Sequence, residues 1–192
     1  MFLENYAEIT DCIVIDTETV TDQASGMSKV WEIGLLVIKD SEIIDRKEWL
    51  IAPNAKFEKL DLFYPEEHVN VEKIKSSPKF VDLYSEMKPY LDPDAIICGH
   101  NIDYDIRVIN YELANLKLTL IGSKKVDTIR LARTVHPGWA HYKLDNVCEE
   151  YGLDIEKRHR ALDDAEATAI IFLEMRKKFI KDNSPVEEFG LF

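Results

Sequence analysis

The chain has 192 residues, which is the length of one globular domain with room for a full hydrophobic core. Its composition, 46% hydrophobic and 31% charged, excludes collagenous, mucin-like and disordered chains. Acidic residues outnumber basic ones by 36 to 24, and the net charge of −12 argues against a protein that binds polyanions through a basic face. Clustered carboxylates can, however, be metal ligands rather than solvated surface groups.

The sequence carries no signal for export or membrane insertion. The longest stretch without a charged residue, 134–142, has nine residues, whereas a membrane helix needs roughly 20 apolar ones. The first eleven residues contain three acids and no basic segment, which is unlike a secretory signal. Cys12, Cys98 and Cys148 lie among apolar neighbours without C-x-x-C spacing, which is typical of reduced core thiols. We therefore expect a cytoplasmic protein.

Apolar runs near the start of the chain predict three consecutive strands. Cys12–Ile15 and Val30–Ile38 are rich in β-branched residues, and Ile43–Ile51 has apolar ends around a charged middle. The polar turn Lys39–Ser41 joins the second run to the third. Short links of this kind predict an antiparallel meander.

The rest of the chain alternates helices with short strands. Helical spacing of apolar residues predicts a helix from Phe80 to Leu91, then a strand at Ala95–Cys98. Further helices are expected at 105–116, 129–135, 144–151 and 161–181, with a short strand near Val126. This order implies one mixed α/β domain with about five strands over residues 1–181 and a short tail over 182–192.

Asp16 and Glu18 form the first of three polar groups that could carry chemistry. They follow directly on the first predicted strand and, being two residues apart, share one face of it. Two carboxylates so placed repel one another unless they share a cation, and their hard oxygen ligands suit Mg²⁺ or Mn²⁺. Taken alone, the pair is equally what a solvated strand end looks like in an acidic chain.

The second and third groups each stand at the start of a predicted helix. His100-Asn101-Ile102-Asp103-Tyr104-Asp105 follows the fourth strand, and His159-Arg160-Ala161-Leu162-Asp163-Asp164 opens the last helix. Acids in a first helical turn are favourable charges without any ligand. A His five residues before an Asp can place both around one metal-bound water, or the two can be a surface side chain and a cap. Considered singly, each group leaves both interpretations open.

Taken together and in this order, the three groups resemble the DnaQ-like, or DEDDh, family of 3′-to-5′ exonucleases. The resemblance extends from Asp16 to Ala165. Three shorter motifs support the resemblance, because this family tends to have similar motifs at these places. They are Glu32-Ile33-Gly34, Asp127-Thr128 with the following Ile-Arg-Leu-Ala-Arg, and Lys143-Leu144-Asp145-Asn146.

The resemblance implies a ribonuclease H-like fold, a mixed five-stranded sheet flanked by helices, and a metal-dependent phosphodiester hydrolase. It implies two divalent cations, Mg²⁺ or Mn²⁺, and His159 as the general base. Asp103 and Asp163 are then neighbours of the site rather than ligands. The four metal-binding carboxylates would be Asp16, Glu18, Asp105 and Asp164.

The candidate substrate contacts are less well defined. After Thr19 the chain departs from the family, because Val20-Thr21-Asp22 stands where a Thr-Gly-Leu-like continuation is usual. Thr19 and Val20 are therefore our candidates for the residue that wedges the terminal base. The remaining candidates for substrate binding are His100, Asn101 and Arg160. The one net basic stretch, 124–160, could line the path of the nucleic-acid strand; the alternative is that its charges are ordinary solvated ones.

The predicted function is hydrolysis at the 3′ end of single-stranded or frayed DNA, with release of nucleoside 5′-monophosphates, in proofreading or repair. An RNA-directed 3′-to-5′ exoribonuclease is the alternative, because the sequence does not separate the two sugars. A non-catalytic scaffold is opposed by the presence of all five catalytic positions. The tail Glu188–Phe192 resembles the peptide by which bacterial polymerase subunits hold the sliding clamp, so a polymerase subunit or that clamp is a candidate partner; a docked or disordered tail is the alternative.

Overall fold

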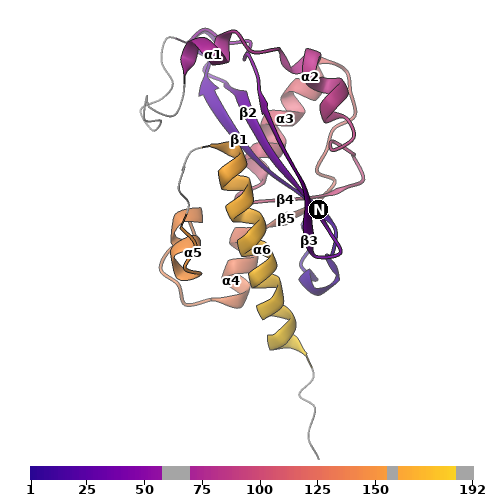
Figure 1. The fold of residues 1–192 in the computed structure, drawn as a ribbon, viewed down its shortest axis with the longest axis vertical. Helices are drawn as coiled ribbons and strands as arrows, with labels where there is room; N and C mark the ends of the chain where they lie inside the picture. The colour runs from indigo at the N-terminus through magenta and orange to yellow at the C-terminus, as the bar shows by residue number, and fades with distance from the viewer. Residues whose placement is uncertain (58–69, 155–159, 185–192) are drawn as a thin grey trace, which may run out of the picture.

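The computed structural model describes residues 1–57, 70–154 and 160–184, and its centre is a five-stranded sheet in the order β3-β2-β1-β4-β5 (Figure 1). The strands are β1 Cys12–Thr21, β2 Ser28–Lys39, β3 Glu42–Leu50, β4 Ile96–Gly99 and β5 Lys124–Asp127. Strands β1, β2 and β3 form an antiparallel meander, whereas β4 pairs parallel with both β1 and β5. The sheet is therefore mixed, and the predicted fold class is confirmed.

Helices cover both faces of this sheet. The helices are η1 Tyr6–Glu8, α1 Val71–Lys75, α2 Phe80–Met87, α3 Asp103–Asn115, α4 Thr128–Val135, α5 Leu144–Glu150 and α6 Ala161–Asn183. Helices α4, α5 and α6 share a core with one face, and α2 and α3 with the other (Figure 1). Adjacent residues of β1 are buried on opposite faces, Val14 toward α6 and Ile15 toward α3. This accounts for the continuously apolar run at the start of β1.

Strand β1 continues past Ile15, where the sequence-based prediction ended it, as far as Thr21. Pairing with β2 carries it onward, since Glu18 lies opposite Glu32 and the ladder resumes after a register shift that follows Glu18. Asp16 and Glu18 therefore project from the middle of a paired strand rather than from its end. Their backbone is fixed by the sheet on the side of β2.

Three helices differ from their predicted bounds by at least two residues. Helix α2 ends at Met87 and is followed by a turn, whereas the apolar spacing predicts a helix as far as Leu91. Leu91 is nevertheless buried in the core under α2 and α3, so its apolar spacing reflects burial rather than helix. Helix α3 begins at Asp103 rather than Asp105, and α6 runs on to Asn183.

The start of α6 lies very close to β2. A Cβ atom on Gly34 would stand 2.1 Å from the carbonyl carbon and oxygen of Ala161 and 2.3 Å from the amide nitrogen of Leu162. Those are backbone atoms, so glycine is what allows the approach. The first turn of α6 is thereby held over the paired strands β1 and β2.

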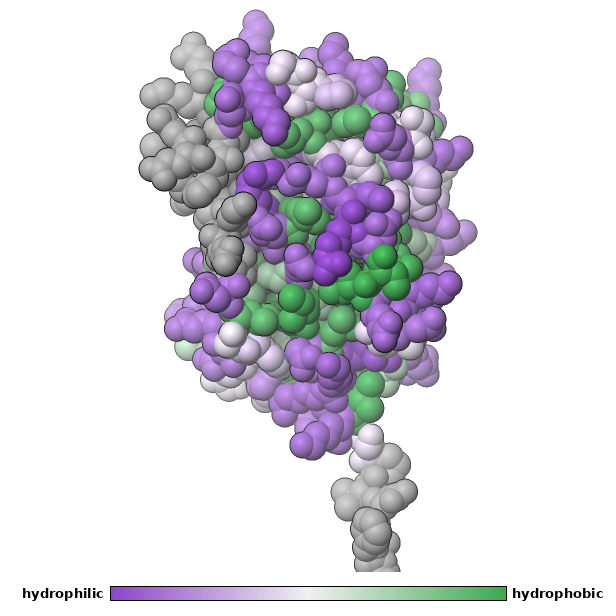
Figure 2. Space-filling view, in the orientation of Figure 1, coloured by the Kyte–Doolittle hydropathy of each residue, from purple (hydrophilic) through white to green (hydrophobic). Residues whose placement is uncertain are grey.

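The face of the molecule drawn in Figure 2 is mainly polar. Figure 2 shows hydrophilic residues over most of the face seen in Figure 1, with apolar residues gathered in smaller patches between them. Within the described ranges, no helix combines the length and the apolar character that crossing a membrane requires.

Candidate active site

Three carboxylates from β1 and α6 converge at one place. Oxygen atoms of Asp16, Glu18 and Asp164 all lie within 4.8 Å of one another. The period of two along β1 puts Asp16 and Glu18 on one face, and the approach of α6 to β2 brings the first turn of α6, which contains Asp164, over that face. The structure thus brings together three of the four carboxylates that the sequence predicts as ligands.

Asp105 reaches the same region from α3. It is 4% exposed, and its Oδ1 accepts a hydrogen bond of 2.7 Å from the hydroxyl of Thr17. Thr17 lies between Asp16 and Glu18 in β1, and its side chain contacts α3 on the opposite face of the sheet. Thr17 is not among the site residues predicted from the sequence, although the period of two along the strand places its side chain on that opposite face.

Electrostatic repulsion inside the site is strong. Burial, followed by the negative charges of Asp105, Asp164, Glu18 and Glu32, raises the pKa of Asp16 well above its usual value. Burial likewise raises the pKa of Asp105 to about 7, even though the hydrogen bond from Thr17 acts to lower it. A site of this kind holds its charges at neutral pH most readily when a cation is shared among them.

The donor set fits a divalent metal. Carboxylate oxygens are the ligands that Mg²⁺ and Mn²⁺ prefer, and the cluster offers one from each of three side chains that the chain holds close together. Asp16, Glu18 and Asp164 would hold the ion directly. Asp105 lies beside them, and its charge adds to the field at Asp16.

The family model of the exonucleases, RNase_T, matches residues 13–172, a span that contains every part of this cluster. The chain belongs to the RNase_T exonuclease family. It is therefore an exonuclease-family nuclease, and its acidic cluster is that of a family of metal-dependent hydrolases. The predicted family is confirmed.

Curated relatives agree with this membership. The chain is 32% identical over 170 residues to the 3′-5′ exonuclease DinG of Bacillus subtilis, and the match covers 86% of this chain and 18% of that protein. It is 30% identical over 169 residues to the PolC-type DNA polymerase III of Lacticaseibacillus paracasei, covering 88% of this chain and 11% of that protein. The chain thus spans less than a fifth of the length of either relative.

Solved structures show the same fold. The nuclease domain of 3′hExo, a DEDDh family member bound to rAMP, superimposes with a TM-score of 0.71 at 16% identity, over 91% of this chain and 93% of that one. Exonuclease X in complex with 5′ overhanging duplex DNA gives a TM-score of 0.63 at 20% identity, over 86% and 91%. The ribonuclease H-like fold of this RNase_T exonuclease is therefore confirmed.

The structure places the five predicted substrate residues in different surroundings. The Thr19 hydroxyl shares a hydrogen bond of 2.6 Å with the hydroxyl of Tyr104, one residue before Asp105. Val20 is 2% exposed, in an apolar cluster with Trp31, Phe57 and Ile74. Of the two candidates for the wedge, Thr19 is the more accessible.

His100 and Asn101 line a cavity of about 450 Å³ together with Arg133, Tyr142 and Lys143. Nδ1 of His100 lies 2.8 Å from the hydroxyl of Thr128, and Nε2 is buried without a hydrogen-bond partner among the described residues. Burial lowers the pKa of His100, so the ring is neutral at pH 7. The cavity has basic and aromatic walls.

Arg160 is engaged within the protein. Its guanidinium donates to Glu32 at 2.6 Å and 2.9 Å and to Glu48 at 2.8 Å. The side chain that the sequence assigns to the substrate is thus bound by two acids of β2 and β3. In the sequence, Glu32 stands out only as part of the short motif Glu32-Ile33-Gly34, because a charge in the middle of a strand gives no sign of its partner.

Two predicted features lie outside the described residues. His159, the expected general base, precedes the described part of α6, and the clamp-like tail Glu188–Phe192 follows it. The described basic residues of the stretch 124–160 are divided among separate contacts. Arg130 lies over the ring of Phe2, and Lys125 pairs with Asp103, whereas Arg133 and Lys143 line the cavity beside His100.

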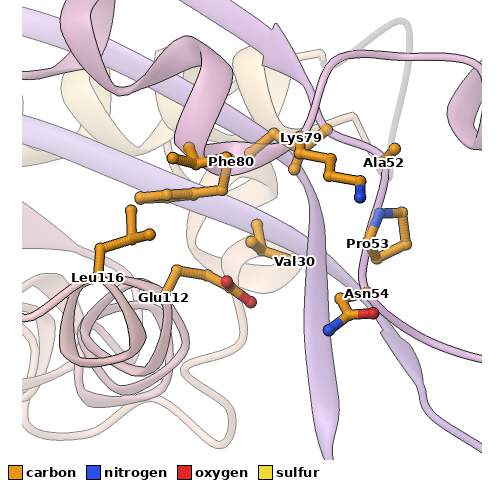
Figure 3. A pocket seen from close by; sticks show the side chains of 10 residues that line it. Val30, Ala52, Pro53, Asn54, Lys79, Phe80, Glu112 and Leu116 are labelled. Carbon is orange, nitrogen blue, oxygen red and sulfur yellow. The ribbon is translucent and has the colours of Figure 1, made fainter.

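A second cavity, of about 170 Å³, lies against the other face of the sheet, where α2 and α3 pack (Figure 3). Val30, Phe80 and Leu116 provide apolar walls, while Lys79 and Glu112 bring a charge of each sign (Figure 3). None of the sequence-predicted site residues that the structure describes lines it. We therefore leave it outside the candidate active site.

Proposed function

We propose that this chain is a two-metal-dependent 3′-to-5′ exonuclease that removes nucleotides from single-stranded or frayed DNA and releases nucleoside 5′-monophosphates. The observation that carries the proposal is the convergence of Asp16, Glu18 and Asp164 within 4.8 Å, with Asp105 beside them. The 3′-to-5′ polarity is supported by the relative DinG of Bacillus subtilis, a 3′-5′ exonuclease. DNA is supported by the DNA polymerase relative at 30% identity.

Divalent cations, when bound, would activate water and compensate charge on the scissile phosphate. The residues of the chain have separate tasks around that chemistry. Asp16, Glu18 and Asp164 would hold the cations, and Thr17 orients Asp105 through its hydroxyl. His159 would accept the proton of the attacking water, which an imidazole with an ordinary pKa near 6.5 can do at neutral pH.

The single-stranded nucleic acid would approach through the cavity beside His100. Arg133, whose guanidinium lies over the ring of Tyr142, and Lys143 offer positive charge for phosphates. Thr19, held by Tyr104, would contact the terminal nucleotide. A duplex end must fray before it can enter such a site, and mismatched ends fray most easily, so proofreading or repair of 3′ ends is the role we propose.

RNA is the second candidate substrate. It is favoured by structural neighbours named for 3′-exonuclease recognition of a histone mRNA stem-loop and for binding rAMP, at 15% and 16% identity. These likenesses concern the fold alone, so DNA remains our first choice. A polymerase or its sliding clamp, reached through Glu188–Phe192, is the proposed partner.

The test uses 5′-labelled single-stranded DNA, mismatched duplex DNA and RNA, each with Mg²⁺, Mn²⁺ or EDTA. We expect a ladder that shortens from the 3′ end, nucleoside 5′-monophosphate products, preference for DNA, and no reaction in EDTA or with Asp16→Asn. Internal cleavage or release of nucleotides from the 5′ end would refute the proposal. Faster trimming of RNA than of DNA would favour the exoribonuclease alternative. Deletion of residues 188–192 with unchanged affinity for the cognate clamp would refute the proposed partner.

A further inference from the structure

Glu32 is a fully buried carboxylate in the wall of the site that does not belong to the metal-binding cluster. Its exposure is 0%, and it lies directly opposite Glu18 in the β1–β2 ladder. Its negative charge is one of the causes that raise the pKa of Asp16. A buried acid in this place needs partners of its own, because an unpaired buried charge is strongly unfavourable.

Both oxygens of Glu32 are bound by the start of α6. Oε1 accepts from Nε and a terminal nitrogen of Arg160 at 2.9 Å and 2.6 Å, and Oε2 accepts from the backbone N–H of Ala161 at 3.0 Å. Arg160 is the N-cap residue of α6, and its own side chain makes no capping hydrogen bond. Glu32 therefore caps α6 from a neighbouring strand, at the positive end of the helix.

Arg160 is linked to a proposed metal ligand, Asp164, and is next in sequence to the proposed general base, His159. The amide of Asp164 donates to the carbonyl of Arg160 at 3.0 Å, which ties the ligand Asp164 to the anchored residue through the first turn of the helix. In the sequence, Arg160 directly follows His159. Glu48 of β3 accepts a hydrogen bond of 2.8 Å from the same terminal nitrogen of Arg160 that donates to Glu32.

We propose that Glu32 is a positioning residue: through Arg160 and the Ala161 amide it sets the start of α6, and thereby the position of Asp164. This inference rests on the proposed function. It reassigns Arg160 from a substrate contact to part of the support of the metal-binding cluster. Groups that orient ligands in this way typically affect metal affinity or activity by about 10- to 100-fold.

The experiment compares Glu32→Gln, Arg160→Gln, Arg160→Lys and the double variant Glu32→Gln/Arg160→Gln. Mn²⁺ affinity is measured by titration calorimetry, and kcat and KM are measured on a single-stranded oligonucleotide. We expect Glu32→Gln to weaken Mn²⁺ binding and to lower kcat, each by about 10- to 100-fold, with KM changed less than about threefold. The double variant should lose no more Mn²⁺ affinity and kcat than the poorer single variant, because both substitutions break the same Glu32–Arg160 interaction. Arg160→Lys should recover part of the loss, since a single ammonium replaces only part of a bidentate pair.

Arg46→Gln is the matched control. It removes another ion pair between β3 and α6, from Arg46 to Glu166 at 2.8 Å, on the partly exposed flank of the helix. Mn²⁺ affinity and kcat should stay at the wild-type level. If Glu32→Gln unfolds the protein, Arg160→Lys is compared with wild type instead. Hydrogen exchange of the backbone amides in the first turn of α6 then reports whether the start of the helix has changed.

Three outcomes would overturn the proposal. One is a folded Glu32→Gln variant with wild-type Mn²⁺ affinity and kcat. Another is an Arg160→Gln variant that raises KM alone, which would mark a substrate contact. The third is additive losses in the double variant. Mn²⁺ binding is measured without a polynucleotide. A wild-type protein that binds Mn²⁺ without cutting DNA or RNA would therefore refute the proposed function, while the effect of Glu32→Gln on Mn²⁺ affinity could still be measured.

Discussion

Asp163 and Asp164 are neighbours in the first turn of α6, yet only Asp164 has an oxygen in the three-carboxylate cluster. A helix turns by about 100° per residue, so adjacent side chains point to different sides. The pair therefore offers a comparison in which charge, helix position and side-chain size are the same. What differs is the direction of the carboxylate.

We expect Asp164→Asn to lower metal-dependent hydrolysis by roughly 100-fold or more, because a ligand that supports a catalytic cation contributes several kcal/mol to the transition state. Asp163→Asn should stay within about threefold of wild type, as a substitution outside the reacting groups usually has small effects. The measurement is initial rate on a labelled oligonucleotide at saturating Mg²⁺. Equal losses in the two variants would show that the first turn as a whole, rather than the ligand, is sensitive.

Asp105 links the charge of the site to the stability of the metal-free protein. Burial raises its pKa in the folded chain to about 7, from an ordinary value of 3.8. The folded state then binds more protons than the unfolded state between these values, so the free energy of unfolding falls as the pH rises from about 4 to 7. The upper bound on this loss is about 4 kcal/mol, since one pKa unit corresponds to about 1.4 kcal/mol.

In EDTA, the melting temperature of the wild type should therefore fall between pH 5 and pH 8. Asp105→Asn should flatten that dependence and be the more stable protein at pH 8, while losing activity. Asp103→Asn is the control, because Asp103 lies in the same turn of α3, pairs with Lys125 at the surface and is 56% exposed. Parallel curves for wild type and Asp105→Asn would contradict the prediction.

At the scale of elements, the junction of β2 with α6 depends on Gly34. A methyl group there would overlap backbone atoms of Ala161 and Leu162, which cannot move aside as a flexible side chain can. Gly34→Ala should therefore displace the start of α6. Gly138 is the matched control, because a Cβ at that position would meet no atom of the described residues within 4 Å.

We expect Gly34→Ala to lower the free energy of unfolding by about 1–3 kcal/mol or more, as overpacking in a dense interior does, and to weaken Mn²⁺ binding as Asp164 shifts. Gly138→Ala should leave the stability within about 0.5 kcal/mol of wild type, the usual range for surface substitutions. Urea denaturation and Mn²⁺ titration check both. A Gly34→Ala protein that is stable and binds metal normally would show that α6 can shift without harm to the site.

Much of this arrangement can be predicted from the sequence, because it follows from local pattern. Apolar runs and helical spacing locate the strands and the long helix, and the period of two predicts that Asp16 and Glu18 share a face. The order of the three motifs predicts the convergence with Asp164. What the sequence does not give is contact between distant elements. The hydrogen bond from Thr17 to Asp105 spans 88 positions, and that from Arg160 to Glu32 spans 128.

At the scale of the whole molecule, the net charge of −12 limits how a polyanion can be held. The cavity beside His100 has two basic side chains on its wall, Arg133 and Lys143, while Lys125 and Arg130 are occupied by Asp103 and by the ring of Phe2. Affinity for the strand should therefore rest on a few phosphate contacts and on the metal site, rather than on a long basic surface.

Salt dependence tests this limit. Each phosphate contact on a single strand contributes about 0.7 to the slope of log affinity against log salt, so two contacts predict a slope near −1.4 for kcat/KM against NaCl at fixed Mg²⁺. Arg133→Gln should halve that slope. Lys177→Gln, the same change of charge at a residue of α6 paired with Glu174, should leave it unchanged. A slope steeper than about −3 in the wild type would mean more than four phosphate contacts. The cavity walls alone could not supply that number, and the strand would then have to follow a longer basic path across the protein.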